Sequence, residues 1–156
     1  MGKLRLASQQ DNIMLLWVEE TQAEDGLLTH RIYTNQYQKT ASANGRYWQR
    51  PQQVADIQHH SFNETPALYL AKNGTAISTW AETNRPILYA NIFTPEQGWQ
   101  AESEVIFSQF DPQNKTRLAL PSAIILADGN IQVVWKNNTK LNNTDNTKII
   151  TAYRTK

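Results

Sequence analysis

The chain has 156 residues, of which 15 are basic and 14 acidic, so its net charge is +1. This balance excludes strong electrostatic steering toward nucleic acid or an anionic membrane. The absence of cysteine excludes disulfides, thiol catalysis and thiolate metal sites.

Three units of about 50 residues follow one another along the chain, with the same order of features in each. The first unit starts near Lys3, continues through an apolar segment that ends at Trp17, and then reads IYTNQY over residues 32–37. A polar turn and a second tryptophan, Trp48, open its last segment. The alternation of apolar and polar residues predicts four short strands in this unit.

The second and third units repeat this order. Pro66 lies 14 residues before Trp80, and the motif LYANIF and a second tryptophan, Trp99, follow. Pro121 likewise lies 14 residues before Trp135, and IITAY follows, but no fourth segment comes before the last residue of the chain. We therefore expect twelve or fewer strands in three antiparallel sheets, with almost no helix.

Two glycine turns mark the hairpins of the later units. Asn-Gly and Asp-Gly are strong hairpin signals, because both central residues of a type I′ turn have positive φ. The pairs Asn73-Gly74 and Asp128-Gly129 therefore predict tight type I′ turns. In the first unit, residues 10–12 (Gln-Asp-Asn) take this place and predict a looser loop.

This pattern of proline, glycine turn, tryptophan strand, aromatic strand and Gly-Trp resembles a tandem β-propeller repeat of bacterial envelope and secreted proteins. Its layout is similar to sialidase-type and other lectin-like propellers. The resemblance implies an all-β fold, a partial propeller of about three blades, with blade one at about 3–56, blade two at about 66–107 and an incomplete blade three at about 121–156. The alternative fold is a β-sandwich. The resemblance also implies an extracytoplasmic location, periplasmic or secreted, although no secretion signal is visible in MGKLRLASQQDN.

Trp17, Trp80 and Trp135 share one position of the repeat, at which a large ring would pack between neighbouring blades. We therefore expect all three to be mostly buried core residues.

The candidate binding face follows from propeller topology. Connections between the second and third strands, and between successive blades, lie on one face, and here these connections are the long ones, at 19–30, 136–148, 56–65 and 108–120. The candidate ligand-binding residues are Glu19, Arg31, His59, His60, Glu82, Arg85 and Arg117.

Catalytic and metal sites are weakly indicated. Glu19 and Glu82 each follow a tryptophan by two positions, and paired carboxylates are used in acid–base chemistry on glycans. The alternative, that both are polar strand ends, is favoured, so no catalytic residue is predicted. His59 and His60 are adjacent and have no third ligand at a telling spacing, so neither a metal nor a cofactor is expected.

The expected function is a non-enzymatic binding or scaffold module that recognises a protein or glycan through the long-loop face. The alternatives are a carbohydrate-binding lectin and a sialidase-like glycan-active enzyme. Because three blades do not close a ring, we expect either a homo-oligomer, such as a six-bladed ring of two chains, or further blades elsewhere. No nucleic-acid partner is expected. No membrane span is expected either, because no apolar run approaches about 18 residues.

Overall fold

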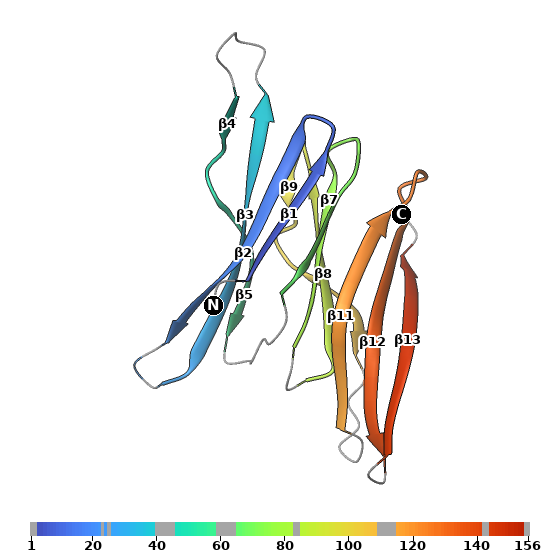
Figure 1. The fold of residues 1–156 in the computed structure, drawn as a ribbon. Helices are drawn as coiled ribbons and strands as arrows, with labels where there is room; N and C mark the ends of the chain where they lie inside the picture. Colours follow the sequence, from blue (N-terminus) through green and yellow to red (C-terminus); the bar gives the residue numbers. More distant parts are fainter. Residues whose placement is uncertain are drawn as a thin grey trace.

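The computed structural model describes most of the chain as β-structure. The residues described are 3–22, 24, 26–39, 46–58, 65–82, 85–108, 115–141 and 144–154. Within them the chain forms thirteen strands and no helix, in three antiparallel sheets that follow one another along the sequence (Figure 1). The expected all-β fold with almost no helix is confirmed. No helix in these residues is long and apolar enough to cross a membrane.

Each sheet is built from consecutive strands. Sheet A contains β1 (Leu4–Gln9), β2 (Asn12–Gln22), β3 (Leu28–Lys39), β4 (Arg46–Trp48) and β5 (Gln52–Gln58). Sheet B contains β6 (Ala67–Leu70), β7 (Ala76–Ala81), β8 (Ile87–Thr94), β9 (Gly98–Trp99) and β10 (Glu104–Ser108). Sheet C contains β11 (Lys115–Ile125), β12 (Ile131–Leu141) and β13 (Thr144–Arg154).

The expectation of twelve or fewer strands is wrong because the fourth strand is split in sheets A and B. In sheet A, β3 pairs with β4 and then with β5, on the other side of Pro51. Proline has no N–H to give to a ladder, so the pairing is interrupted there. In sheet B, β8 pairs with β9 and then with β10, and residues 100–103 separate the two.

The glycine hairpins of sheets B and C form as expected, but their turns are not of type I′. The N–H of Gly74 donates to the carbonyl of Ala71 (3.0 Å), and the N–H of Ala71 donates to the carbonyl of Thr75 (2.8 Å). Only the glycine has positive φ, 85° at Gly74 and 84° at Gly129, where the same bonds recur. Each is a type I turn followed by a left-handed glycine, the usual three-residue hairpin loop.

The residues before the glycines contribute side-chain hydrogen bonds to these turns. Asn73 Oδ1 accepts a bond from the N–H of Thr75 (3.1 Å), and Asp128 Oδ1 accepts one from the N–H of Asn130 (2.9 Å). The first hairpin is tighter than expected: its loop has two residues, of which Gln10 has φ 55°.

Two of the expected long connections are largely strand. β2 and β3 pair along their length as far as Gln22 and Leu28, and β12 and β13 pair as far as Leu141 and Thr144. Polar side chains bond across the second ladder, where Thr147 Oγ1 donates to Asn138 Oδ1 (2.9 Å). Threonine favours strands, and a ladder that extends beyond the core satisfies its own backbone.

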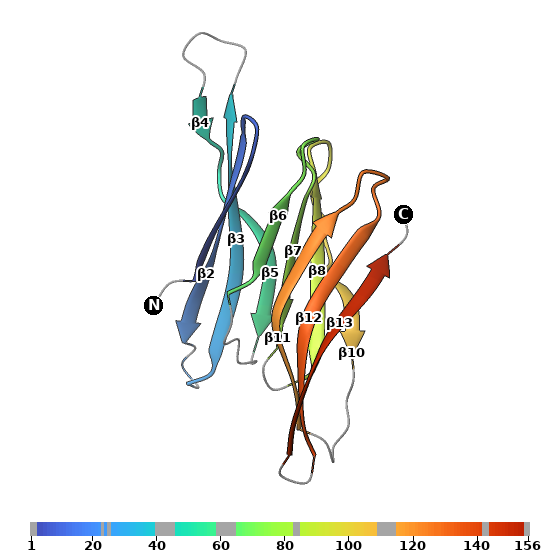
Figure 2. The same cartoon turned by 45° about the vertical axis from the view of Figure 1, so that its right-hand side comes forward.

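Sheet B lies between sheets A and C and packs against both (Figures 1 and 2). All six residues of its middle strand, β7, are buried. Ala76 and Trp80 face sheet A, whereas Ile77 and Ala81 face sheet C, because successive side chains of a strand point to opposite faces. The core therefore consists of two apolar layers, one on each side of sheet B.

The sheets approach one another most closely through their first strands. Backbone of β1 lies beside β6, and β11 lies beside β6 and β7. Towards the later strands, the sheets separate and are joined through side chains. Figure 2 shows this fan-like row of sheets.

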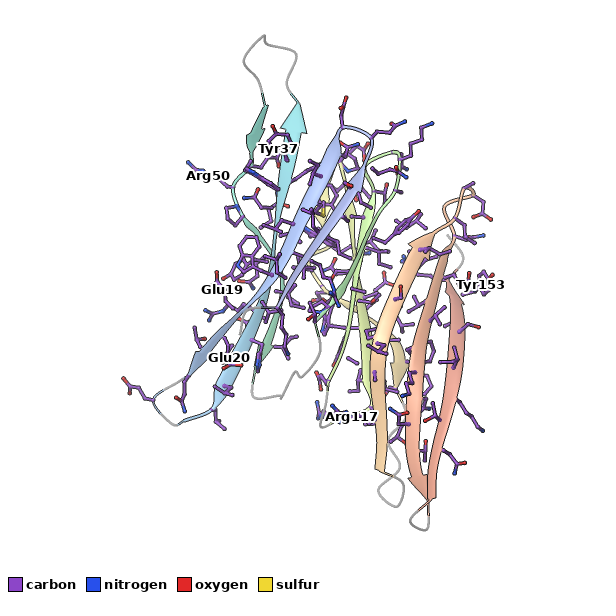
Figure 3. All side chains as sticks on the ribbon, viewed as in Figure 1. Glu19, Glu20, Tyr37, Arg50, Arg117 and Tyr153 are labelled. Carbon is purple, nitrogen blue, oxygen red and sulfur yellow. The ribbon has the colours of Figure 1, made fainter. Side chains whose placement is uncertain are left out.

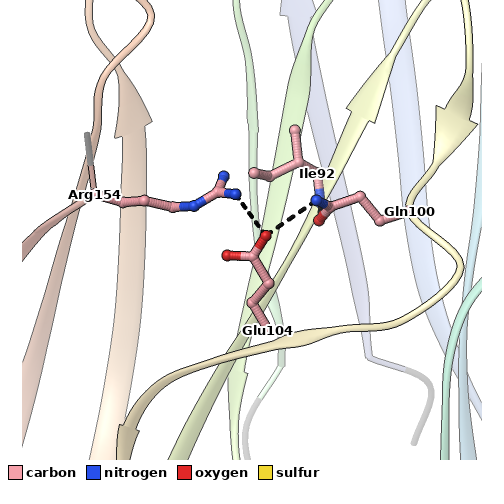
Figure 4. A network of polar contacts seen from close by, with 4 residues as sticks. All are labelled: Ile92, Gln100, Glu104 and Arg154. Atoms are coloured by element: carbon pink, nitrogen blue, oxygen red, sulfur yellow. Dashed lines mark hydrogen bonds and ion pairs between the residues drawn. The ribbon is translucent and has the colours of Figure 1, made fainter. Parts of the chain in front are cut away.

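Polar contacts also join neighbouring sheets. Trp99 Nε1 donates to Thr34 Oγ1 (2.7 Å), and Asn91 Nδ2 donates to the carbonyl of Val54 (3.0 Å), so both connect sheet B to sheet A. Arg154 of sheet C pairs with Glu104 of sheet B (2.6 Å), whose carboxylate also accepts a bond from Gln100 (Figure 4). This pair follows the charge distribution: residues 59–113 carry six acidic and two basic side chains, and residues 114–156 carry seven basic and two acidic ones.

The three repeated tryptophans differ in burial. Trp80 and Trp135 are each 2% exposed and lie in the layers between sheets, which confirms the expectation for both. Trp17 is only partly buried. It lies on the face of sheet A that is turned away from sheet B, where no other sheet of the described residues covers it.

Candidate functional site

A cavity of about 680 Å³ lies between sheets A and B, beside their later strands. One wall is β5, with Asp56 among its residues. The other wall comes from sheet B and includes the aromatic rings of Trp80, Tyr89 and Trp99. We call this cavity the A–B groove. It exists because the sheets touch at their first strands and separate toward the others.

Glu82 is the most deeply buried charged side chain of the A–B groove. It directly follows β7, its N–H donates to the carbonyl of Ile87 (3.1 Å), and it is 5% exposed. Its Oε2 atom is buried and has no hydrogen-bond partner in the described part of the chain. Buried polar groups are nearly always satisfied, so an open carboxylate oxygen beside a cavity indicates a position for a donor from a ligand or water.

Tyr89 and Arg85 surround this carboxylate. The ring of Tyr89 stacks on Trp80, with centroids 5.8 Å apart and planes 14° apart. Burial raises the pKa of the Tyr89 phenol, and the negative charge of Glu82 and a hydrogen bond to it raise that pKa further, whereas Arg85 lowers it. Glu82 and Tyr89 therefore form a hydrogen-bonded pair in the lining of the groove, which also includes the exposed Arg85.

Tyr89 gives protein stability a dependence on pH. Its pKa in the folded state is raised above the ordinary 10.0, so the folded protein holds this proton more tightly than the unfolded chain does. The contribution is fully present below about pH 10 and is lost as pH rises through the folded-state pKa. We expect the urea midpoint to fall more steeply above about pH 10 in the wild type than in Tyr89→Phe. Equal slopes for the two proteins would contradict this assignment.

Asp56 of β5 also lines the groove, but its carboxylate is paired with Arg31 on the side of sheet A that is turned away from sheet B. Asp56 Oδ2 accepts a bond from Arg31 Nε (3.3 Å), and both side chains are partly exposed. The indole N–H of Trp99 is also occupied, since it bonds to Thr34 across the sheets. The groove thus offers one open buried carboxylate between aromatic rings, which suits a ligand with hydroxyl donors and an apolar face.

The candidates from the sequence fall in different places. Glu82 and Arg85 line the A–B groove, whereas Arg31 pairs with Asp56 on the other side of sheet A. Glu19 lies outside it: its Oε1 accepts a bond from Trp17 Nε1 (3.0 Å) on the open face of sheet A.

The remaining candidates are not brought to the groove. Arg117 is exposed on β11 of sheet C, away from Glu19 on sheet A (Figure 3). His59 and His60 lie outside the described residues.

Sequence reasoning missed several residues of the groove. Tyr89 and Trp99 belong to repeated motifs, LYANIF and Gly-Trp, and these motifs were interpreted only as structure. Asp56 and Gln100 have no local signal, because only the packing of sheet A on sheet B brings them together.

Comparison of this chain with protein-family models gives no match, and a search of curated protein sequences gives none either. The function is therefore inferred from the geometry of the groove.

Proposed function

We propose that this chain is a propeller-type binding module in which each sheet is a blade and the A–B groove binds a glycan. Three features support the blade interpretation: sequential antiparallel strand order, close approach through the first strands, and repeated tryptophans at the sheet interfaces. A two-layer sandwich is disfavoured because the middle sheet is buried on both faces.

The class of ligand is inferred from the carboxylate oxygen of Glu82 that has no hydrogen-bond partner in the described residues. This oxygen offers a strong acceptor to a hydroxyl group in a site where water access is restricted. The stacked Trp80 and Tyr89 and the nearby Trp99 supply the apolar surface on which a sugar ring would pack. A protein surface remains the alternative ligand, and a periplasmic or secreted location fits either.

The proposed role is binding rather than catalysis. Retaining and inverting glycosidases use two carboxyl groups that flank the scissile bond. Three carboxylates line the groove in the described residues. Asp56 is engaged by Arg31 and Glu102 is exposed, so Glu82 is the one that is both buried and has an open oxygen.

A glycan array followed by titration calorimetry tests the proposal. We expect Glu82→Gln to weaken glycan binding about tenfold or more, because a hydrogen bond to a charged acceptor contributes about 1.5–3 kcal/mol. Glu19→Gln is the matched control, since Glu19 holds the same position after tryptophan but lies outside the groove. It should bind like the wild type.

Two results would contradict the proposal. One is the absence of binding to any glycan on the array. The other is equal loss of affinity in Glu82→Gln and Glu19→Gln, which would place the ligand elsewhere. Release of a shortened glycan product would replace binding by catalysis.

A further inference from the structure

Sheet A has an apolar face that no other part of the described chain covers. We call it the Trp17 face. Register places its residues on one side of β1–β4, the side turned away from sheet B. They are Leu4, Leu6, Leu15, Trp17, Tyr33, Tyr37 and Trp48. Leu6 is 64% exposed, and the rings of Trp17 and Tyr33 stack with centroids 5.7 Å apart.

The same positions are covered in the other two sheets. Trp80 and Tyr89 pair in the ladder of sheet B as Trp17 and Tyr33 do in sheet A, and they pack against sheet A. Trp135 of sheet C packs against sheet B in the same way. The fold therefore makes this type of contact twice. Each time, the face of one sheet that carries the tryptophan packs on the face of the preceding sheet that does not carry it.

The face of sheet C that does not carry Trp135 corresponds to the faces of sheets A and B that cover Trp80 and Trp135. We call it the Ile149 face. Its residues are Val134, Lys136, Ile149, Thr151 and Tyr153. Ile149 pairs with the residue after Trp135, as Ile32 pairs with the residue after Trp17 and Leu88 with the residue after Trp80. Ile32 and Leu88 are 0% exposed beneath the next sheet, whereas Ile149 is 68% exposed.

The hydrogen bond that joins sheet B to sheet A has candidate counterparts of both its donor and its acceptor on the Trp17 face and the Ile149 face. Trp99 of sheet B donates to Thr34 of sheet A, and Trp99 packs beside Phe93. Trp48 lies beside Tyr37 in the same arrangement, on the Trp17 face. Thr151 holds the place of Thr34, since each pairs with the residue before the repeated tryptophan.

The charges of the Trp17 face and the Ile149 face are also complementary. Glu19, Arg31 and Asp56 lie together at one end of the Trp17 face, with one net negative charge among them, and Lys136 lies opposite Ile149 in sheet C. Opposite charges on two faces steer them together and disfavour pairing of either face with itself.

We infer that the Trp17 face binds the Ile149 face of a second copy of this chain, in the register by which sheet B packs on sheet A. Trp48 Nε1 then donates to Thr151 Oγ1 of the other copy. The contact is heterologous, so two copies that contact each other through both faces form a ring of six sheets.

Sedimentation velocity at micromolar concentration tests the inference. We expect the wild type to sediment as a dimer or larger species, and Leu6→Asp and Ile149→Asp each to sediment as monomers. Both positions are exposed in the single chain, so the core is untouched, and circular dichroism checks the fold. Leu4→Asp is a second variant of the same face. Val105→Asp, at an exposed apolar position on neither face, is the matched control and should associate like the wild type.

A mixing experiment gives the decisive result. Leu6→Asp keeps an intact Ile149 face, and Ile149→Asp keeps an intact Trp17 face, so the two monomeric variants should form a one-to-one complex when mixed. Thr151→Val should weaken association of the wild type severalfold, since it removes only the acceptor for Trp48.

Three results would overturn the inference. The first is a wild-type monomer throughout the concentration range, which would mean that another chain covers the face. The second is a dimer of Ile149→Asp alone, which would mean that two Trp17 faces pair. The third is failure of the two folded variants to combine.

Discussion

Truncation of Trp80 or Trp135 to alanine is expected to lower the free energy of unfolding by about 3–5 kcal/mol. Each indole is 2% exposed and fills the layer between two sheets, so its removal leaves a cavity in contact with both. Trp80→Ala removes the ring that packs against Leu16 and Ile32 of sheet A. Urea unfolding followed by circular dichroism measures the loss.

Trp17→Ala is the matched control for these two variants. Trp17 has the same sequence context but is only partly buried, so we expect a smaller loss of about 1–2 kcal/mol in dilute solution. A loss at Trp17 equal to that at Trp80 would contradict the assignment of an open face to sheet A.

Replacement of Asn91 by alanine is expected to cost about 1–3 kcal/mol, because the carbonyl of Val54 loses a buried donor and that of Gln100 a part-buried one. Removal of Asn91 Oδ1, which has no partner in the described residues, offsets part of this loss. Asn91 is 0% exposed, and its Nδ2 donates to the carbonyl of Val54 (3.0 Å) in sheet A and to that of Gln100 (3.2 Å) in sheet B. Urea unfolding measures the change, and loss of this link should also expose Trp99 to quenching by acrylamide.

Thr79→Val is the control for Asn91→Ala. Thr79 is also 0% exposed, but its hydroxyl is buried without a hydrogen-bond partner in the described residues. Leu16 and Val134 hold the same position before the tryptophans of sheets A and C. Valine has nearly the shape of threonine and no unsatisfied hydroxyl, so stability should stay the same or rise by about 1 kcal/mol. A loss as large as that of Asn91→Ala would show that any change at these sites is harmful.

The repeat could be recognised from the sequence because its signals are local. Gly74 and Gly129 stand at the same distance from a tryptophan, and alternation assigns Ile77 and Trp80 to opposite faces. The turn type could not be deduced, because Asn-Gly fits both a type I′ turn and a type I turn with a left-handed glycine. The expectation of a long connection at residues 136–148 was wrong, because a polar ladder beyond the core has no apolar alternation by which to recognise it.

The candidate site was only partly predictable, as Glu19 and Glu82 illustrate. The two residues follow their tryptophans at the same distance, and the sequence treats them as equivalent. Glu82 is buried in the A–B groove because sheet A covers that side of sheet B, whereas Glu19 lies on the open side of sheet A. The repeat places a carboxylate in each unit, but the neighbouring sheet decides which carboxylate becomes part of a cavity.

The split fourth strand has a consequence for aggregation. A strand that ends a sheet leaves N–H and C=O groups exposed along one edge, and long, regular edges invite pairing with other chains. Sheets A and B end in the short strands β5 and β10, each with a bulge in its ladder. Sheet C ends in β13, eleven residues long and paired without interruption. Edge-to-edge polymerisation at high concentration would therefore start at β13, where Lys148 and Arg154 provide the charge that opposes it.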